Sequence, residues 1–253
     1  MFGLQNFRGS CWVNTALQGI FRIPEVQQRY SEEKADVDNP TDIALQRIWK
    51  SEGKDGLKEF FASVRHVSIP AGRSVGDAHE LIVYLLDKLP FLDTLCRFKV
   101  ADTIECTECD YRSTKEDSRI EFSLFPTEKG MPITACIAKE VIAEIPDDSK
   151  CEKCSKKYKK QLLLGTFPKV FILHVFTDSS KGTMYSSVLG INKQKYGLVS
   201  ILSYNGSHWW MYGRNVIGEP WYTLDDTRVV RHNADEFPLS GDMRILIYYQ
   251  LDE

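Results

Sequence analysis

The sequence predicts an α+β fold, in which a mainly helical first third precedes a series of short strands. From Cys11 to Phe21 apolar side chains recur every three to four positions, the period of one helix face, and residues 74–90 repeat this pattern more clearly. Later segments are short, rich in β-branched and aromatic residues, and separated by turn-forming residues, as is typical of strands. Helices first and strands afterwards indicate the α+β class.

The same patterns predict the remaining elements. Two shorter helices are expected at residues 41–49, with Thr41 as the N-cap, and at residues 57–64, and a further helix is expected at residues 133–145. The expected strands cover residues 97–105, 119–125, 162–164, 169–176, 197–202, 208–213, 221–224 and 244–250. No internal repeat or linker divides the chain, and 253 residues suit one large domain or two small ones.

Composition excludes several classes of protein. The hydrophobic fraction of 43% and the charged fraction of 26% are ordinary for a globular chain, so a sizeable core can form. A net charge of −3 argues against binding to nucleic acid or to an anionic membrane. No apolar run approaches the roughly 20 residues that span a bilayer, and the first residues do not form a secretory signal. We therefore expect a protein of the cytoplasm or nucleus, with neither nucleic acid nor membrane as a partner.

Four of the seven cysteines form two closely spaced pairs, Cys106 with Cys109 and Cys151 with Cys154. Each pair has the CxxC spacing, which presents two thiolates to one face of a tetrahedral ion. Two such knuckles complete a closed four-cysteine zinc site, whose role is structural because no coordination position is left open. Disulfides or a redox-active CxxC are the alternatives, although disulfides are rare in a reducing compartment.

Cys11 is the candidate nucleophile, because it lies where a polar loop enters the first amphipathic helix. A thiol at a helix N-terminus feels the positive end of the helix dipole, which favours the reactive thiolate. Asn6, on the same loop, is placed to donate its side-chain amide to a developing oxyanion, an interaction typically worth about 3 kcal/mol. Taken alone, these two residues fit a buried core cysteine and a turn asparagine better.

His208 is the candidate base among five histidines. A strand follows it, and the next strand ends in Asp225 and Asp226. If these strands are antiparallel neighbours, a carboxylate lies beside the imidazole, fixes its tautomer and leaves the other ring nitrogen for the thiol. Asp225 is the preferred partner, and Asp226 is the second choice or a helper near the oxyanion. The alternative is a hydrogen-bonded sheet histidine followed by a solvated turn.

One helix carries a candidate site for a basic substrate. Asp77 and Glu80 are three residues apart on the helix predicted at residues 74–90, with Tyr84 one turn further along the same face. Two carboxylates on one turn can accept charge-assisted hydrogen bonds from an arginine. An ordinary solvated charged face is the alternative.

Three stretches near the N-terminus resemble the cysteine box of ubiquitin-specific proteases: residues 3–6 (Gly-Leu-Gln-Asn), 10–14 (Ser-Cys-Trp-Val-Asn) and 17–18 (Leu-Gln). The family box consists of a Gly-Leu-x-Asn loop, a Thr-Cys-Tyr-Met-Asn segment and a Leu-Gln on the following helix. This chain departs from it at residues 8–10, where Gly-Asn-Thr is usual, and at Trp12, where Tyr is usual. The Cys-Trp pair is also similar to that of a smaller SUMO-directed relative.

Further blocks resemble the family in the same order along the chain. Residues 76–81 are similar to its Gln-Asp-Ala-His-Glu-Phe motif, with Gly76 in place of Gln. Residues 204–212 and 221–226 resemble its histidine box and the Asp-Asp strand that follows. The resemblance therefore covers nearly the whole chain.

The resemblance implies a papain-like cysteine protease fold in one catalytic domain. It divides the chain into a mainly helical thumb (residues 1–92), zinc-bearing β fingers (residues 93–180) and a β palm (residues 181–253). The implied reaction is hydrolysis of the isopeptide bond after the C-terminal glycine of ubiquitin. Ubiquitin or a ubiquitin conjugate is thus the expected partner, zinc is the expected structural cofactor, and we expect a monomer.

The resemblance also implies roles for particular side chains. Cys11, His208 and Asp225 form the catalytic triad, and Asp77 and Glu80 grip the basic C-terminal tail of the substrate. Because that tail ends in Gly-Gly, bulky side chains can close over its backbone as channel walls. The side chains expected in these walls are Trp12, Trp209 and Trp210.

Two rival functions remain open. The first keeps the chemistry and changes the modifier to SUMO or another ubiquitin-like protein. The second is a silent scaffold that binds ubiquitin without cutting it, against which stands the intact set of Cys11, His208 and Asp225. Ubiquitin implies a eukaryotic setting, or a host cytosol for a pathogen-encoded enzyme.

Overall fold

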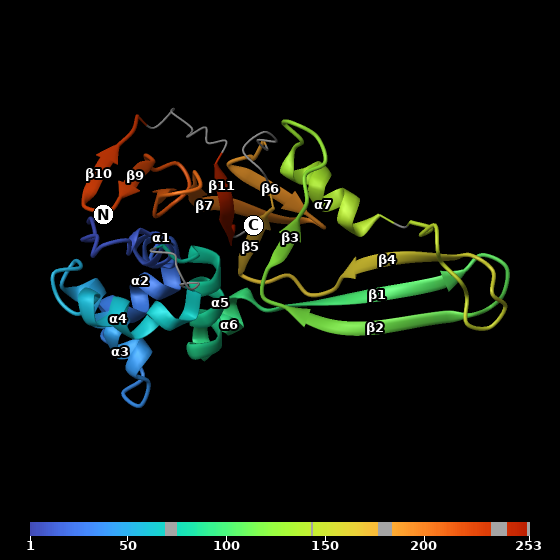
Figure 1. The fold of residues 1–253 in the computed structure, drawn as a ribbon, viewed down its shortest axis with the longest axis horizontal. Coiled ribbons are helices and arrows are strands. Elements are labelled where there is room, and N and C mark those ends of the chain that lie inside the picture. Colours follow the sequence, from blue (N-terminus) through green and yellow to red (C-terminus); the bar gives the residue numbers. More distant parts are fainter. Residues whose placement is uncertain (69–74, 143, 177–183, 234–241, 252–253) are drawn as a thin grey trace.

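The computed structural model describes residues 1–68, 75–142, 144–176, 184–233 and 242–251, which form three parts (Figure 1). Helices of the first hundred residues form the thumb, a large sheet forms the palm, and a three-stranded sheet extends away from both as the fingers. The predicted α+β class is confirmed. None of the helices in these described ranges is long and apolar enough to span a membrane.

Six helices form the described part of the thumb. They are α1 (Cys11–Ile20), α2 (Pro24–Ser31), α3 (Pro40–Lys50), α4 (Leu57–Ser68), α5 (Ala78–Lys88) and α6 (Pro90–Cys96). The four helices predicted in this region are present, although the predicted start at residue 74 lies outside the described residues. The predicted N-cap of α3 is wrong: Asn39, not Thr41, accepts hydrogen bonds from the N–H groups of Thr41 and Asp42. Pro40 then occupies the first helical position, where a missing N–H costs nothing.

The palm is an eight-stranded sheet of order β10-β9-β8-β7-β11-β5-β3, with β6 paired to β7. Its strands are β3 (Phe122–Leu124), β5 (Val170–Val175), β6 (Val188–Ile191), β7 (Gln194–Tyr204), β8 (Trp209–Gly213), β9 (Tyr222–Asp225), β10 (Arg228–Arg231) and β11 (Met243–Gln250). Only β3 and β5 pair in parallel among these described strands.

The fingers are narrower than the sequence suggests. They consist of β1 (Phe98–Cys106), β2 (Arg112–Arg119) and β4 (Tyr158–Leu164), in the order β2-β1-β4. Two palm strands, β3 and β5, fall inside the stretch assigned to the fingers, and the expected boundary at residue 92 falls inside α6. The helix predicted at residues 133–145 is α7 (Ile133–Val141), which ends earlier and packs against β3 and β4.

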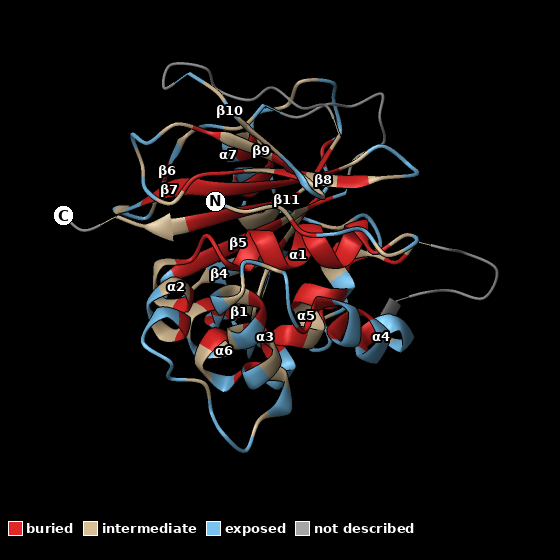
Figure 2. Ribbon diagram, turned by 90° about the vertical axis from the view of Figure 1, so that its left-hand side faces the viewer, coloured by how far each residue is buried: buried red, intermediate tan, exposed pale blue. Residues whose placement is uncertain are grey.

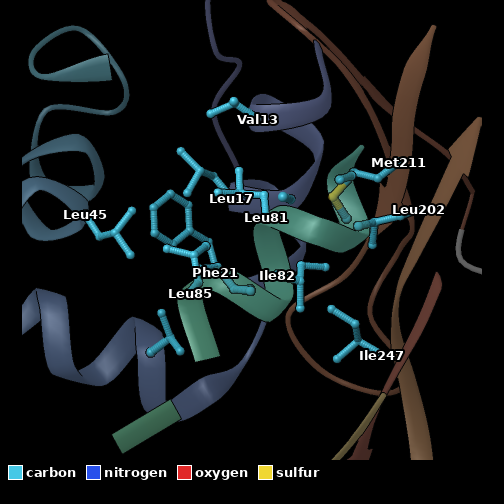
Figure 3. Packing of buried hydrophobic residues seen from close by; sticks show 14 of the residues in the cluster. Val13, Leu17, Phe21, Leu45, Leu81, Ile82, Leu85, Leu202, Met211 and Ile247 are labelled. Atoms are coloured by element: carbon cyan, nitrogen blue, oxygen red, sulfur yellow. The ribbon is translucent and has the colours of Figure 1, made fainter. Parts of the chain in front are cut away.

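Helix α1 lies between the palm sheet and the other thumb helices, and all ten of its residues are buried (Figure 2). Its apolar side chains meet those of α5 and of the palm in one core, which Figure 3 shows around Leu17, Leu81 and Leu202. Gly19 allows the close approach to the sheet, because a Cβ there would lie 3.0 Å from a methyl group of Leu202. A second core lies on the other face of the sheet, beneath α7.

Candidate active site

Cys11 is the first residue of α1, in the layer between thumb and palm, and is 2% exposed. Burial raises the pKa of its thiol above the ordinary value, and the nearby carboxylate of Asp226 raises it further, whereas the main-chain N–H of Trp209 acts to lower it. The thiol is therefore protonated at neutral pH in this state, and a base is needed to activate it.

His208 lies immediately before β8, at the end of a tight turn. The side-chain oxygen of Asn205 accepts hydrogen bonds from the N–H groups of Ser207 and His208, and Gly206 has a φ of 98°, a conformation that favours glycine. This turn is followed directly by Trp209, the residue whose main-chain N–H acts to lower the pKa of the Cys11 thiol. Among the described residues, no direct hydrogen bond joins the Cys11 sulfur to the His208 ring.

Asp225 ends β9, the antiparallel neighbour of β8. Its Oδ1 lies 2.7 Å from Nε2 of His208, so the strand pairing brings the carboxylate and the imidazole together as the sequence led us to expect. Because Nε2 is engaged, Nδ1 is the ring nitrogen left to exchange a proton with the thiol. Both side chains are about one-third exposed, so solvent reaches the pair.

Asp226 does not bind the His208 ring. It connects the palm to the loop that precedes α1 and to α1 itself. Its Oδ2 accepts a hydrogen bond from Nδ2 of Asn6 at 2.8 Å, and its Oδ1 accepts one from Nδ2 of Asn14 at 2.7 Å. Asn6 Oδ1 in turn accepts from the N–H groups of Gly9 and Ser10, which fixes the plane of its amide. The arrangement ties the Asn6 amide to the loop that leads into Cys11, with one amide hydrogen committed to Asp226.

Asn14 is a site residue to which the sequence alone assigned no role. It lies one turn after Cys11 and is 2% exposed, and its Nδ2 also donates to the carbonyl groups of Leu4 and Gln5. One turn later Gln18 donates to the carbonyl of Phe2. Two amides four residues apart on a helix that is otherwise mostly apolar are the signal that could have predicted this, because buried polar groups need partners.

The three tryptophans that we expect in the channel walls differ in how far they are exposed. Trp12 is 0% exposed and Trp209 is 3% exposed, so both rings are buried in this structure, and their role as channel walls stays a prediction. Trp209 donates its indole N–H to the carbonyl of Gly76, which ties the palm to the start of α5. Trp210 alone of the three is partly exposed, and its ring stacks at 6.3 Å from that of His208.

Two departures from the family pattern are in contact with each other. A Cβ on Gly76 would lie 2.7 Å from the indole ring of Trp12, which real side chains do not tolerate. The larger ring at position 12 therefore fills the space that a side chain at position 76 would need.

Helix α5 meets the palm through a cluster of three ionisable side chains: His79, Glu121 and His174. Asp77 is the N-cap of α5 and accepts from the N–H of His79, and burial raises the pKa of its carboxyl group. Nε2 of His79 lies 2.5 Å from Oε2 of Glu121, and its ring stacks at 3.7 Å on that of His174. Burial, with the neighbouring His79 acting in the same direction, lowers the pKa of His174 to about 4. Glu80, the second predicted tail-binding acid, is exposed.

The four paired cysteines meet at the tip of the fingers. Their sulfur atoms all lie within 4.8 Å of one another, with 3.5 Å between Cys106 and Cys154 and 3.8 Å between Cys109 and Cys151. A tetrahedral ion with Zn–S bonds of about 2.3 Å requires sulfur separations of about 3.8 Å. The donor set therefore fits a four-coordinate metal ion.

Comparisons with known proteins agree with this geometry. A family model described as "Ubiquitin carboxyl-terminal hydrolase" matches residues 2–248. The chain is 21% identical over 333 residues to ubiquitin carboxyl-terminal hydrolase 2 of Rattus norvegicus, covering 98% of this chain and 54% of the relative. It is 22% identical to probable ubiquitin carboxyl-terminal hydrolase 8 of Schizosaccharomyces pombe, covering 98% of this chain and 64% of the relative. A third match, to the Bos taurus hydrolase 2, is 24% identical and covers 60% of this chain and 30% of the relative. The chain thus spans less than two-thirds of these relatives.

Two solved structures share the fold over the whole chain. The first is the SAGA DUB module Ubp8/Sgf11/Sus1/Sgf73 with a cysteine-to-alanine variant of Ubp8, bound to monoubiquitin. Its TM-score is 0.82 at 19% identity, covering 100% of this chain and 69% of that one. The second is the same module bound to ubiquitin aldehyde, with a TM-score of 0.80 at 18% identity, covering 100% and 70%.

Proposed function

Because the chain belongs to the ubiquitin carboxyl-terminal hydrolase family, we propose that it is a cysteine protease that hydrolyses the isopeptide bond after the C-terminal glycine of ubiquitin. The observation that supports the proposal is the 2.7 Å contact between Nε2 of His208 and Oδ1 of Asp225, together with the packing of α1, which begins at Cys11, against β8 and β9. The two similar folds solved with monoubiquitin and with ubiquitin aldehyde support ubiquitin as the partner.

The reaction begins with proton transfer from the Cys11 thiol to Nδ1 of His208. The resulting thiolate attacks the carbonyl carbon of the terminal glycine, and the imidazolium, stabilised by Asp225, returns the proton to the leaving lysine amine as the C–N bond breaks. Water then attacks the thioester while His208 takes its proton. The C–S bond breaks, and the thiol and a free ubiquitin carboxylate are restored.

Asn6 is the proposed side-chain donor to the oxyanion. Its amide has one hydrogen bonded to Asp226 and a second available for the negative oxygen of the tetrahedral intermediate. Asp226 acts as a positioning residue, because it holds Asn6 and Asn14 together across the junction of thumb and palm. The main-chain N–H of Cys11, at the start of α1, is the second proposed donor.

Asp77 and Glu80 are the proposed acceptors for arginine in the substrate tail. Glu80 is exposed, whereas Asp77 already caps α5, so Glu80 is expected to contribute more of the charge interaction. Zn²⁺ is the proposed ion between the four finger cysteines, where four thiolates close its coordination shell and exclude a catalytic role. The cytoplasm or nucleus remains a prediction from the sequence.

A ubiquitin probe with a C-terminal electrophile tests nucleophile, modifier and activity together. Intact mass spectrometry is expected to detect one covalent ubiquitin per chain, attached to Cys11 and absent in Cys11→Ala. Cys96→Ala is the matched control, since Cys96 is a fully buried cysteine at the end of α6 and its loss should leave the adduct.

The outcome distinguishes the rival functions. A SUMO probe of the same design is run in parallel. If only the SUMO probe reacts with Cys11, the proposed substrate is SUMO and not ubiquitin. Ubiquitin binding without an adduct, and without cleavage of any ubiquitin substrate, would identify a scaffold and overturn the proposed activity.

A further inference from the structure

Arg22 is a buried cation without an acidic partner. It lies two residues after the end of α1 and is 1% exposed, and burial lowers the pKa of its guanidinium to about 10. The group therefore remains protonated at neutral pH. Its Nη1 donates to Oδ1 of Asn215 at 2.8 Å and contacts the sulfur of Met1, and neither of these atoms carries a charge. Among the residues that the structure describes, no carboxylate oxygen lies within 4.0 Å of Arg22, although an unpaired buried charge is costly.

The other two nitrogens of Arg22, Nε and Nη2, are buried and have no hydrogen-bond partner among the described residues. Their N–H groups form one edge of the planar guanidinium, which can donate two parallel hydrogen bonds to a carboxylate or a phosphate. Arg47 uses this edge to bind Asp55, and Arg97 uses it to bind Asp93. Since buried polar groups are almost always paired, the unpaired edge of Arg22 indicates a site for an oxyanion.

Neighbouring residues hold the Arg22 side chain in place. A Cβ on Gly213 would lie 3.2 Å from Cγ of Arg22, so the glycine leaves room for the aliphatic stem. The guanidinium carbon lies 6.0 Å from the centre of the Trp49 ring. Nε2 of Gln27 donates at 3.1 Å to the same Asn215 oxygen that Arg22 contacts. A side chain that is already held loses little entropy when it binds a ligand, so the site is preorganised.

A cavity of about 440 Å³ adjoins Arg22. Its walls include residues of α2, the end of α3 and the segment after β8, and both Trp49 and Lys50 line it. Lys50 is exposed and supplies a second positive charge, although it also pairs with Glu33 at 2.6 Å. Glu52 lines the cavity as well, but it is exposed and its carboxylate pairs with Lys54. Cavities of roughly 300 to 1,000 Å³ are typical of small-molecule sites, so a small ligand fits this one.

We propose that this cavity binds a small molecule through a carboxylate or phosphate group, which accepts hydrogen bonds from Nε and Nη2 of Arg22. Such a group neutralises the buried charge and pairs both N–H groups. Lys50 attracts the anion, and the Trp49 ring offers an apolar wall to the rest of the ligand. Met1, which contacts Nη1, is 37% exposed and flexible enough to move aside as the ligand enters. Cys11 begins α1 whereas Arg22 follows its end, so the cavity is separate from the nucleophile.

Isothermal titration calorimetry with two probes, inorganic phosphate and succinate, tests the proposal at constant ionic strength. The wild-type protein is expected to bind at least one of them at one site per chain, with a Kd of about 1 mM or below. The probe that binds more tightly identifies the preferred group, phosphate or carboxylate. Arg22→Met keeps a long side chain and removes the charge, so it should abolish binding.

Further variants separate the geometry of Arg22 from charge alone. Arg22→Lys keeps the charge but lacks the planar edge, and should weaken binding at least about tenfold. Arg47→Met is the matched control, because the same edge of Arg47 already holds Asp55, and it should bind the probe as the wild type does. Without anion, Arg22→Met should unfold at a temperature no lower than that of the wild type, since it removes an unpaired buried charge.

Several results would overturn the proposal. One is the absence of binding of either probe by the wild-type protein at concentrations up to about 20 mM. Another is binding that persists in Arg22→Met, or that falls equally in Arg22→Met and Arg47→Met, because the anions would then respond only to net charge. If Arg22→Met does not fold, Arg22→Lys decides the question, and wild-type affinity in that variant would reject a role for the planar edge.

Discussion

The body of the molecule, formed by thumb and palm, is stabilised in a different way from the fingers. β7 crosses the palm with eight consecutive buried residues, between apolar layers on both faces. β2 in the fingers has seven of its eight residues exposed, yet it pairs with β1 over its whole length. The comparison teaches that β7 is held by burial, whereas β2 is held by main-chain pairing with β1 near the four-cysteine cluster at the tip of the fingers.

Metal removal should produce the largest difference in stability between the body and the fingers, because binding of a structural zinc ion contributes on the order of 10 kcal/mol to folding. Treatment with a chelator, or Cys109→Ser, is expected to expose the amides of β1, β2 and β4 to hydrogen exchange while α1 and β7 keep their protection. Glu108→Ser, a change of a knuckle residue that is not a ligand, is the control. Unchanged exchange in the fingers after metal loss would contradict the comparison.

Asp225→Asn should lower the catalytic rate without changing the structure of the fingers. The amide keeps the size of the carboxylate but does not stabilise an imidazolium, so kcat is expected to fall about 10⁴-fold. Turnover of the ubiquitin–coumarin substrate measures the effect. Asp117→Asn on exposed β2 is the matched change and should leave turnover within a factor of two or so. Comparable losses in both variants would refute the assignment of Asp225.

Two leucines sharpen the contrast in stability. Leu17→Ala removes a 0% exposed side chain from the core between α1, α5 and the palm, and should lower the free energy of unfolding by about 3 kcal/mol. Leu163→Ala in β4 removes a side chain that is 43% exposed and should cost less than about 0.5 kcal/mol. Urea denaturation of both variants measures the difference, and similar midpoints would show that the fingers have an apolar core of their own.

The smallest effect concerns pH at the junction of thumb and palm. The pKa of His174 is lowered to about 4 by burial, with His79 and Arg244 acting in the same direction and Glu121 against them. The folded state therefore binds fewer protons than the unfolded chain between about pH 6.5 and pH 4, so stability should fall as pH drops through this window. We expect a loss of about 2 kcal/mol between pH 7 and pH 5, measured by urea denaturation. In His174→Gln this part of the pH dependence should disappear.

Residues with strong local signals were predictable from the sequence. The period of α1 and α5 identified both helices, and the CxxC spacing identified four cysteines that the fold brings together. β2 was missed because its Arg-Ser-Thr-Lys-Glu-Asp-Ser-Arg sequence has no apolar alternation, and only pairing with β1 makes it a strand. The burial of Trp12 and Trp209 depends on contacts with residues far away in the sequence, and hydrophobic periodicity does not predict such contacts.

The fit between Gly76 and Trp12 restricts how this cleft can be altered. Changing position 76 first places a side chain against the indole ring, whereas changing position 12 first leaves a hole beside the glycine. Either single step loses stability, so the pair is expected to change together in evolution. A chimera that imports only one of the two residues from a relative should be less stable than one that imports both.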